Sequence, residues 1–183
     1  MIGCILAGGL GRRMGGPKAT AELAGRPLIS YPLDTLAAVC ERVVVVCKAQ
    51  TELPPLAVER WDEPDDPHHP IAGITHALER AGEPILVCGA DMPLVTAEAL
   101  GLIADELRPG MKAAVAFCDG RLQPLLAAYA PEALEVLRLA PDDEPLTRTV
   151  ESLMPITVDV DPRVAFNVNT PEDLSEAERR FRS

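Results

Sequence analysis

Apolar and polar positions follow two different spacings along this chain. Short and nearly continuous apolar runs, typical of buried strands, occupy residues 2–6, 42–47, 56–59, 85–88, 113–117, 123–129 and 156–160. Apolar residues at helical spacing occupy residues 27–39, 71–81, 96–107, 131–139, 146–153 and a stretch that opens at 171. Because strands that alternate with helices form sheets covered on both faces, the pattern predicts an α/β fold, a three-layer α/β/α sandwich with a mostly parallel sheet.

Two of the predicted helices carry clear signals at their first turn. Thr96 stands where an N-cap residue is expected, and Thr170 is followed by Pro171 and, three positions after it, by Asp173. Residues 61–70 are crowded with Asp, Glu, Pro and His, which predicts a loop. The chain has no internal repeat and no low-complexity linker, so we expect a single domain over residues 1–183.

Composition and charge narrow the classes of partner. Hydrophobic residues make up 48% of the chain but aromatic residues only 3%, so the core has to be built from Val, Leu, Ile and Ala. The net charge of −11 makes nucleic acid and anionic membranes unfavourable partners. The first apolar run stops at Ala7, too early for a signal peptide, and no run approaches the length of a transmembrane helix.

The cysteines indicate a reducing compartment. There are five of them, none in a C-x-x-C pair, and most lie in apolar, strand-like segments. Such residues are typically small core side chains, so we expect a cytoplasmic protein. A reactive thiol at Cys88 is the less favoured alternative.

The segment after the first predicted strand is rich in glycine and in positive charge. It contains five glycines, Gly8 and Gly9 among them, together with Arg12, Arg13 and Lys18. Glycines allow backbone N–H groups to close around an anion, while arginine and lysine side chains bind phosphate oxygens. The combination predicts a site for a polyphosphate, above all a nucleoside triphosphate, and an ordinary glycine-rich surface turn is the less favoured alternative.

The spacing of this segment excludes two better-known phosphate loops. A P-loop requires G-x-x-x-x-G-K-[ST], whereas Lys18 here follows Pro17 and precedes Ala19. The dinucleotide fingerprint G-x-G-x-x-G is missed by one residue. Because the residue before a proline avoids the α region, we expect the segment to stay extended over its ligand.

Asp91 is the second candidate for chemistry. It follows the predicted strand 85–88 and precedes Met92 and Pro93. Ligands of parallel sheets bind at the carboxyl ends of the strands, where the glycine-rich segment also lies. A carboxylate beside bound phosphates is well placed to hold Mg²⁺, which takes few protein oxygens and shares the rest with phosphates and water. The alternative is an Asp that only caps a turn.

Five segments in order resemble the molybdenum cofactor guanylyltransferases over essentially the whole chain. They are LAGGLGRRMGGPK, HPIAGI, CGADMPL, DGRLQPLLAAY and FNVNTPEDL. That family belongs to the MobA-like nucleoside-triphosphate transferases, which have a Rossmann-like, glycosyltransferase-A-like fold. The resemblance implies a cytoplasmic, Mg²⁺-dependent enzyme that transfers GMP from GTP to Mo-molybdopterin and releases pyrophosphate. It also points to transient contact with proteins that deliver molybdopterin or mature molybdoenzymes.

The resemblance assigns roles to individual positions. Catalytic roles fall to Arg13, Lys18 and Asp91, of which Lys18 contacts the phosphates, Arg13 lies near the leaving pyrophosphate and Asp91 is the metal ligand. The nucleotide-binding positions are Leu6, Ala7, Gly8, Gly9, Lys18, Asp62 and Asp91. Asn167 and Asn169 match amides near the cofactor substrate, and Asn169 also lies near the metal in this assignment. Without the resemblance, these two residues fit a loop that leads into a capped helix.

The chain departs from the family pattern at three places. Pro17 replaces an acidic residue before the loop lysine, and His69 replaces a glycine before Pro70. An Asn common at the end of the second predicted strand is missing, and Val46, Cys47 and Lys48 stand there. Recognition of a base depends on specific buried polar contacts. Because this Asn is missing, a cytidylyltransferase or another small-metabolite nucleotidyltransferase remains an alternative function. A non-catalytic nucleotide-binding module is a further alternative. His68 and His69 have no third metal ligand at a recognisable spacing, and we interpret them as loop residues.

Overall fold

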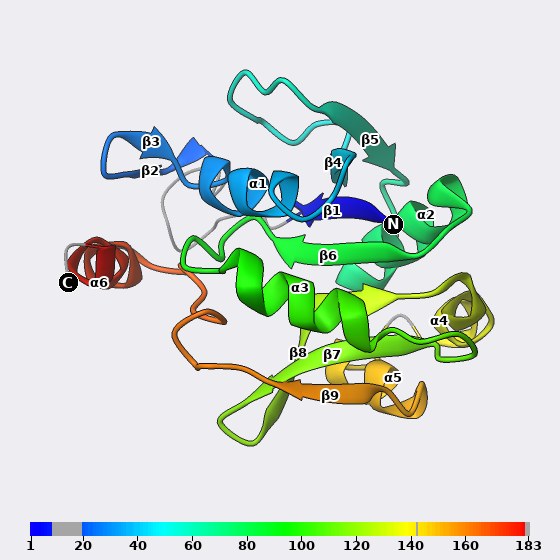
Figure 1. The fold of residues 1–183 in the computed structure, drawn as a ribbon. Helices are drawn as coiled ribbons and strands as arrows, with labels where there is room; N and C mark the ends of the chain where they lie inside the picture. The colour runs from blue at the N-terminus through cyan, green and yellow to red at the C-terminus, as the bar shows by residue number, and fades with distance from the viewer. Residues whose placement is uncertain (9–19, 142, 182–183) are drawn as a thin grey trace.

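A seven-stranded sheet forms the centre of the structure (Figure 1). The structure is a computed structural model that describes residues 1–8, 20–141 and 143–181. The strands run in the order β5-β4-β1-β6-β8-β7-β9, and every adjacent pair is parallel except the two that involve β8. The predicted mostly parallel sheet is therefore confirmed. The strand bounds are Ile2–Leu6 for β1, Val43–Lys48 for β4, Glu59–Glu63 for β5, Ile85–Gly89 for β6, Ala113–Cys118 for β7, Arg121–Tyr129 for β8 and Ile156–Asp159 for β9.

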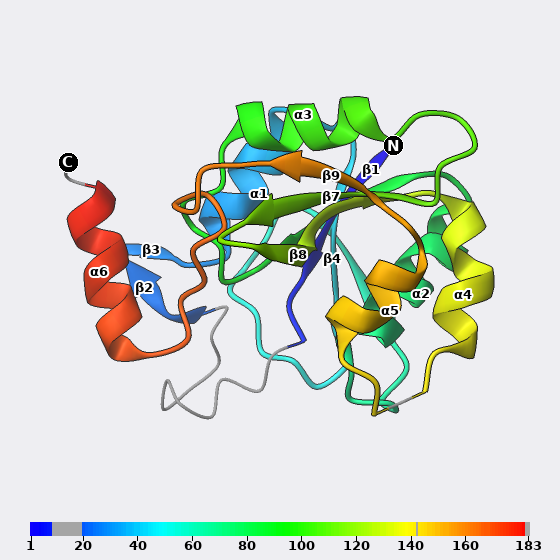
Figure 2. The same cartoon turned by 90° about the horizontal axis from the view of Figure 1, so that it is seen from below.

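Helices cover both faces of the sheet, which confirms the three-layer architecture (Figure 2). The first face is covered by α1 (Ser30–Ala37) and α3 (Ala97–Glu106), and the apolar cluster beneath them includes Ile5 and Leu100. The second face is covered by α2 (Pro70–Ala81), α4 (Leu134–Leu139) and α5 (Leu146–Ser152) over a separate apolar cluster. A short 3-10 turn, Pro131–Ala133, leads into α4. Among the described residues, no helix is both long and apolar enough to cross a bilayer.

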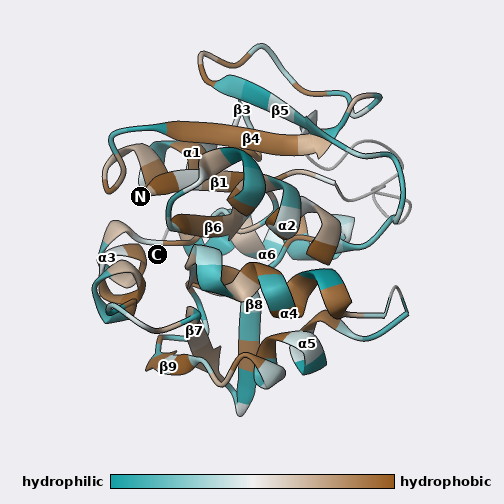
Figure 3. Ribbon diagram, turned by 90° about the vertical axis from the view of Figure 1, so that its right-hand side faces the viewer, coloured by the Kyte–Doolittle hydropathy of each residue, from teal (hydrophilic) through white to brown (hydrophobic). Residues whose placement is uncertain are grey.

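Strands buried on both faces explain the apolar runs of the sequence. All six residues of β4, including Lys48 at its end, are buried, and all five residues of β6 are as well. The edge strand β5 has the opposite character, and Figure 3 shows it as largely hydrophilic beside the hydrophobic β4. Parallel strands between two helical layers need apolar side chains on both faces, whereas an edge strand does not.

A small hairpin and the last helix form a separate group beside the sheet. The hairpin consists of β2 (Glu22–Leu23) and β3 (Arg26–Pro27), and its turn residues Ala24 and Gly25 both have positive φ, as a type I′ turn requires. It packs through Leu23 against Ala177 of α6 (Pro171–Phe181). Figures 1 and 2 both show α6 lying beside this hairpin.

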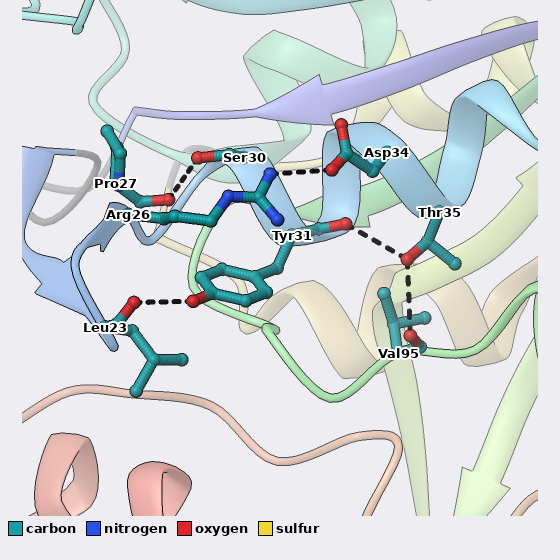
Figure 4. A network of polar contacts seen from close by, with 8 residues as sticks. All are labelled: Leu23, Arg26, Pro27, Ser30, Tyr31, Asp34, Thr35 and Val95. Atoms are coloured by element: carbon teal, nitrogen blue, oxygen red, sulfur yellow. Dashed lines mark hydrogen bonds and ion pairs between the residues drawn. The ribbon is translucent and has the colours of Figure 1, made fainter. Parts of the chain in front are cut away.

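Side chains of α1 attach the hairpin to the rest of the fold (Figure 4). The Tyr31 hydroxyl donates to the carbonyl of Leu23, and Arg26 forms an ion pair of 2.7 Å with Asp34. The Thr35 hydroxyl donates at 3.4 Å to the carbonyl of Val95, which precedes α3. These contacts fix the chain immediately after the glycine-rich segment against two helices of the first layer.

Several element bounds differ from those predicted. The strand expected at 56–59 is displaced to β5, so the loop expected at 61–70 begins later, and the helix expected over 27–39 is shortened to α1 behind the hairpin. Both predicted helix starts are confirmed. The Thr96 hydroxyl accepts from the N–H of Ala99 at 3.2 Å, and Thr170 and Asp173 each accept a hydrogen bond from the other's backbone N–H.

Candidate functional site

The first part of the site is the backbone that follows β1. The N–H of Ala7 donates to the carbonyl of Val46 at 2.9 Å, and the N–H of Ala90 donates to the carbonyl of Leu6 at 3.0 Å. These bonds fix residues 6–8 between the carboxyl ends of β4 and β6, with Ala7 buried and Gly8 exposed. This is the edge at which ligands of parallel sheets bind. Of the predicted phosphate-binding residues, Gly9, Arg13 and Lys18 lie outside the described residues.

The second part is the turn at Asp91. A side chain at Gly89 would place its Cβ 2.8 Å from Oδ1 of Asp91, so the end of β6 has to be glycine for the carboxylate to keep its position. The N–H of Val168 donates to the carbonyl of Asp91 at 2.8 Å. This bond places the segment with Asn167 and Asn169, which is remote in sequence, beside the turn at the end of β6.

The two asparagine side chains are oriented by backbone acceptors. The amide nitrogen of Asn167 donates to the carbonyl of Ala165 at 2.9 Å, and that of Asn169 donates to the carbonyl of Asn167 at 3.5 Å. Both side chains therefore use their amide nitrogens as donors in these bonds. Asp173 fixes the following backbone, because its carboxylate accepts from the N–H groups of Asn169 and Thr170 at 2.9 Å each.

This donor set is compatible with magnesium. A carboxylate on Asp91 and an amide oxygen on Asn169 are hard oxygen ligands, and the glycine at residue 89 leaves room for the carboxylate. Within residues 1–8, 20–141 and 143–181, no three His, Cys, Asp or Glu side chains form a group that could hold a metal. An ion bound here would therefore complete its shell with phosphate and water oxygens, as magnesium in nucleotide sites commonly does.

A cavity of about 520 Å³ lies next to the Asp91 turn. This volume is within the usual range for small-molecule sites. Its lining comes from the turn (Met92), from the β7–β8 hairpin, from α5 (Thr147 and Glu151) and from the segment that contains Asn167. Arg121 and Gln123 of β8 contribute polar groups. The cavity lining thus combines hydrogen-bond donors and acceptors with apolar side chains such as those of Phe117 and Leu122.

The structure places Asp62 away from the backbone of residues 6–8. Its carboxylate is exposed and pairs with Nε of Arg60 at 2.6 Å. Side chains alternate along β5, so Trp61 and Glu63 point to the buried side while Asp62 points to solvent. The acidic side chain near Gly8 is that of Glu63, which sequence reasoning missed.

Glu63 forms a buried ion pair with Lys48. The distance between Oε1 and Nζ is 3.7 Å, and the two side chains are 6% and 7% exposed. Lys48 also donates to the carbonyls of Pro64 and, at 3.1 Å, of Pro67. Burial raises the pKa of Glu63, and the nearby Lys48 ammonium opposes that shift. The signal that could have revealed this pair is a lysine at the end of an otherwise apolar strand.

His68, His69 and the cysteines lie in surroundings that fit structural roles: a loop, a helix cap and the core. Nδ1 of His69 accepts from the N–H of Ile71 at 3.2 Å and caps α2, whereas His68 is exposed. Cys88 is fully buried in β6, and burial raises the pKa of its thiol. Each of the five cysteines is a buried free thiol in the part of the chain that the structure describes. These observations agree with the prediction of small core cysteines.

Comparison with known proteins adds independent information. A family model for the MobA-like NTP transferase domain matches residues 3–157. Two curated relatives are each described as a probable molybdenum cofactor guanylyltransferase. The one from Bacillus licheniformis is 33% identical over 98% of this chain and 97% of its own, and the one from Thermococcus gammatolerans is 32% identical over 96% and 98%.

A solved structure shows the same arrangement. The crystal structure of molybdopterin-guanine dinucleotide biosynthesis protein A from Archaeoglobus fulgidus superposes with a TM-score of 0.84. It is 29% identical, with 100% of this chain and 99% of that chain covered. The family model and the relatives match most of the chain, and this structure shares the fold described above. The chain therefore belongs to the MobA-like NTP transferase family of nucleotidyltransferases, and along its length it is similar to the molybdenum cofactor guanylyltransferases.

Proposed function

We propose that this enzyme transfers GMP from GTP to Mo-molybdopterin in a Mg²⁺-dependent reaction that releases pyrophosphate. The observation that carries the proposal is the hydrogen bond from Val168 to Asp91. It joins a carboxylate at the nucleotide edge of the sheet to a cavity suited to a second substrate. The names of the full-length relatives support the identity of both substrates.

In this proposal the nucleotide lies over residues 6–8 and the end of β6. Leu6, Ala7, Gly8 and Gly9 present backbone to it, and Asp62 stays a candidate for contact from the rim of the site. Lys18 and Arg13 supply positive charge to the phosphates, where negative charge develops as pyrophosphate leaves. Their positions in the sequence support this role, because both come within twelve residues of the end of β1.

Asp91 would hold the magnesium ion, with Asn169 as a neighbouring oxygen donor. A bound Mg²⁺ would neutralise phosphate charge and orient the two substrates. The chain's own contribution is positional. Gly89 leaves space for the carboxylate, and the Val168 N–H fixes the backbone that carries it.

The chemical step needs no general base from the protein. A phosphate oxygen of the acceptor is already ionised and attacks the α-phosphorus of the nucleotide. A phosphorus–oxygen bond forms there while the bond to the β-phosphate bridge breaks, and pyrophosphate leaves with that electron pair. The main task of the site is to bring two anions into line, and alignment supplies much of the acceleration.

The cavity beside Asp91 would take the acceptor. Asn167 lies in its lining, while Arg121 and Gln123 can contact a phosphate and the edge of a heterocycle. We further propose that residues 1–183 act as a single domain in the cytoplasm, with transient contact to proteins that deliver molybdopterin or mature molybdoenzymes. The buried, unpaired cysteines of the described chain support the reducing compartment.

The test is pyrophosphate release with Mo-molybdopterin, Mg²⁺ and each of GTP, CTP, ATP and UTP. Release with GTP alone supports the proposal. Asp91→Asn and Lys18→Ala should each lower turnover at least about a hundredfold, as loss of transition-state stabilisation does. Glu59→Gln, an acid-to-amide change at the other end of the sheet, should retain full activity. Release with CTP instead would assign the cytidylyl reaction, and near-normal turnover by either site variant would refute its assigned role.

A further inference from the structure

The pairing of β8 with β7 is interrupted beside the cavity near Asp91. Val115 of β7 pairs with Ala127, but the next residue of β7, Ala116, pairs with Gln123. One step along β7 therefore corresponds to four steps along β8, and residues 124–126 have no partners on β7. Bulges of this kind are common beside active sites, where they redirect side chains.

The bulge decides on which face of the sheet Gln123 lies. Its partner Ala116 belongs to the apolar cluster of the first face, whereas Ala127 belongs to the cluster of the second face. Side chains four positions apart in a regular strand share one face, so without the bulge Gln123 would lie on the face of Ala127. Gln123 and its neighbours Pro124 and Leu125 all line the cavity, so the bulge shapes this part of its wall.

The Tyr129 hydroxyl holds the bulge closed. It donates to the carbonyl of Pro124 at 2.7 Å, five residues earlier in the same strand. Five residues of extended strand span roughly 16 Å, more than a tyrosine side chain reaches, so the bond forms because the bulge contracts the strand. Tyr129 is fully buried, and burial raises the pKa of its hydroxyl, which therefore stays a donor near neutral pH.

Proline suits position 124 because it has no N–H. A bulge leaves backbone groups without ladder partners, and proline inside a sheet is confined to such places and to edges. At Pro124 the carbonyl alone needs a partner, and Tyr129 supplies it. Because Pro124 lines the cavity, the bond connects a buried residue of the core directly to the cavity wall.

We propose that Tyr129 is a positioning residue for the acceptor, because it fixes the bulge at Pro124 and thereby keeps the Gln123 amide in the cavity. The inference rests on the proposed function, in which this cavity takes the acceptor. The amide of Gln123 offers both donors and an acceptor to a bound molecule. The nucleotide is assigned to residues 6–8 and the end of β6, so Tyr129 should affect the acceptor and leave the nucleotide unaffected.

The test measures pyrophosphate release at varied Mo-molybdopterin and at varied GTP for the wild type and for Tyr129→Phe. This variant keeps the aromatic ring and removes only the hydroxyl. Its KM for Mo-molybdopterin should rise about 3- to 10-fold, the range for one neutral hydrogen bond, while its KM for GTP should stay within about twofold of the wild-type value.

Two further variants show whether Tyr129 acts through the bulge and Gln123. Gln123→Ala should raise the KM for Mo-molybdopterin by itself, and the addition of Tyr129→Phe should then raise it little further, whereas independent effects would multiply. Pro124→Ala restores an N–H and frees the backbone of the bulge, so it should also raise this KM. It applies even if Tyr129→Phe does not fold.

Thr96→Ala is the control for a loss of stability alone. It removes the hydrogen bond of 3.2 Å at the start of α3, and both of its KM values should equal those of the wild type. If the role of Tyr129 were only structural, Tyr129→Phe would behave in the same way. It would lower the fraction of folded enzyme, and with it the apparent kcat, while both KM values stayed unchanged.

The outcomes separate this inference from the proposed function. An unchanged KM for Mo-molybdopterin in Tyr129→Phe, or equal increases of both KM values, would overturn the positioning role and leave the transfer reaction intact. Effects of Tyr129→Phe and Gln123→Ala that multiply would overturn action through Gln123. A wild-type chain that releases no pyrophosphate with Mo-molybdopterin and any nucleotide would overturn both. A rise confined to the KM for Mo-molybdopterin, and absent in the Gln123→Ala background, would support the assignment.

Discussion

Replacement of Lys48 by methionine should destabilise the folded chain strongly. The substitution keeps the length of the side chain but leaves the Glu63 carboxylate buried without its counter-charge, and the Pro64 and Pro67 carbonyls lose their donor. Both members of the pair are more than nine-tenths buried, so water cannot replace the ammonium. Removal of one partner of a buried ion pair costs about 3–5 kcal/mol. For a chain of this length the midpoint of thermal unfolding should fall by roughly 6–20 °C.

The same variant should respond to pH in a defined direction. Burial raises the pKa of Glu63 above the ordinary value of 4.5, and loss of Lys48 removes a group that opposes this rise. The folded state then holds a proton that the unfolded state releases. The free energy of unfolding consequently falls as pH rises from about 4.5 through the folded pKa and is constant above it. Urea unfolding at pH 5 and pH 8 should show the smaller deficit at pH 5.

A double variant isolates the cause. Lys48→Met combined with Glu63→Gln removes the unpaired charge and should recover about 1–3 kcal/mol relative to Lys48→Met alone. A loss below about 1 kcal/mol in the single variant would mean that the pair behaves as a solvated one. Equal stability of the single and double variants would show that the destabilisation arises from packing and not from the stranded carboxylate. Either result would refute the electrostatic reasoning.

Three further outcomes are expected. Thr96→Ala removes the bond to the N–H of Ala99 and should cost about 1 kcal/mol in urea unfolding, with unchanged pyrophosphate release. In the native chain the Tyr129 hydroxyl donates to the Pro124 carbonyl at 2.7 Å. Tyr129→Phe removes this donor and should lower the free energy of unfolding by about 1–3 kcal/mol in the same assay. An unchanged unfolding midpoint would contradict this. The native chain should react slowly with a thiol reagent at pH 7.5 and quickly once it is unfolded. The reason is that burial raises the pKa of every cysteine, that of Cys4 to about 12. Rapid labelling of the native chain would contradict the buried positions of these thiols.

The central strands and both helix caps could be predicted because their signals are local. A buried parallel strand such as β4 needs apolar residues on both faces, and Thr96 and Thr170 cap their helices through bonds within three residues. The strand β5 was displaced because an edge strand tolerates charge, so its charged residues looked like part of a loop. The β2–β3 hairpin was missed because its turn uses Ala24 with positive φ in place of the usual Asn or Asp.

In the candidate site, too, the residues with local sequence signals could be predicted and the others could not. Asp91 and the backbone of residues 6–8 follow from their positions at strand ends, and the structure brings them together. Glu63 was not predicted because three acidic residues stand within five positions of β5, and only the register of the strand decides which one turns inward. The link from Val168 to Asp91 has no sequence signal, since a contact between backbone groups far apart in the chain depends on the whole fold.

The hydrogen bond from Val168 to Asp91 also means that the two halves of the site are completed at different times during translation. The described groups that we assign to the nucleotide come from residues 6–91, whereas Asn167 and Asn169 are synthesised only after the last strand of the sheet. Transfer to an acceptor therefore becomes possible only after the C-terminal part of the chain has been synthesised and Val168 has bonded to the Asp91 turn. A premature stop before residue 165 would keep the nucleotide residues in the sequence and remove the fastening. We expect such a fragment to lack transfer activity.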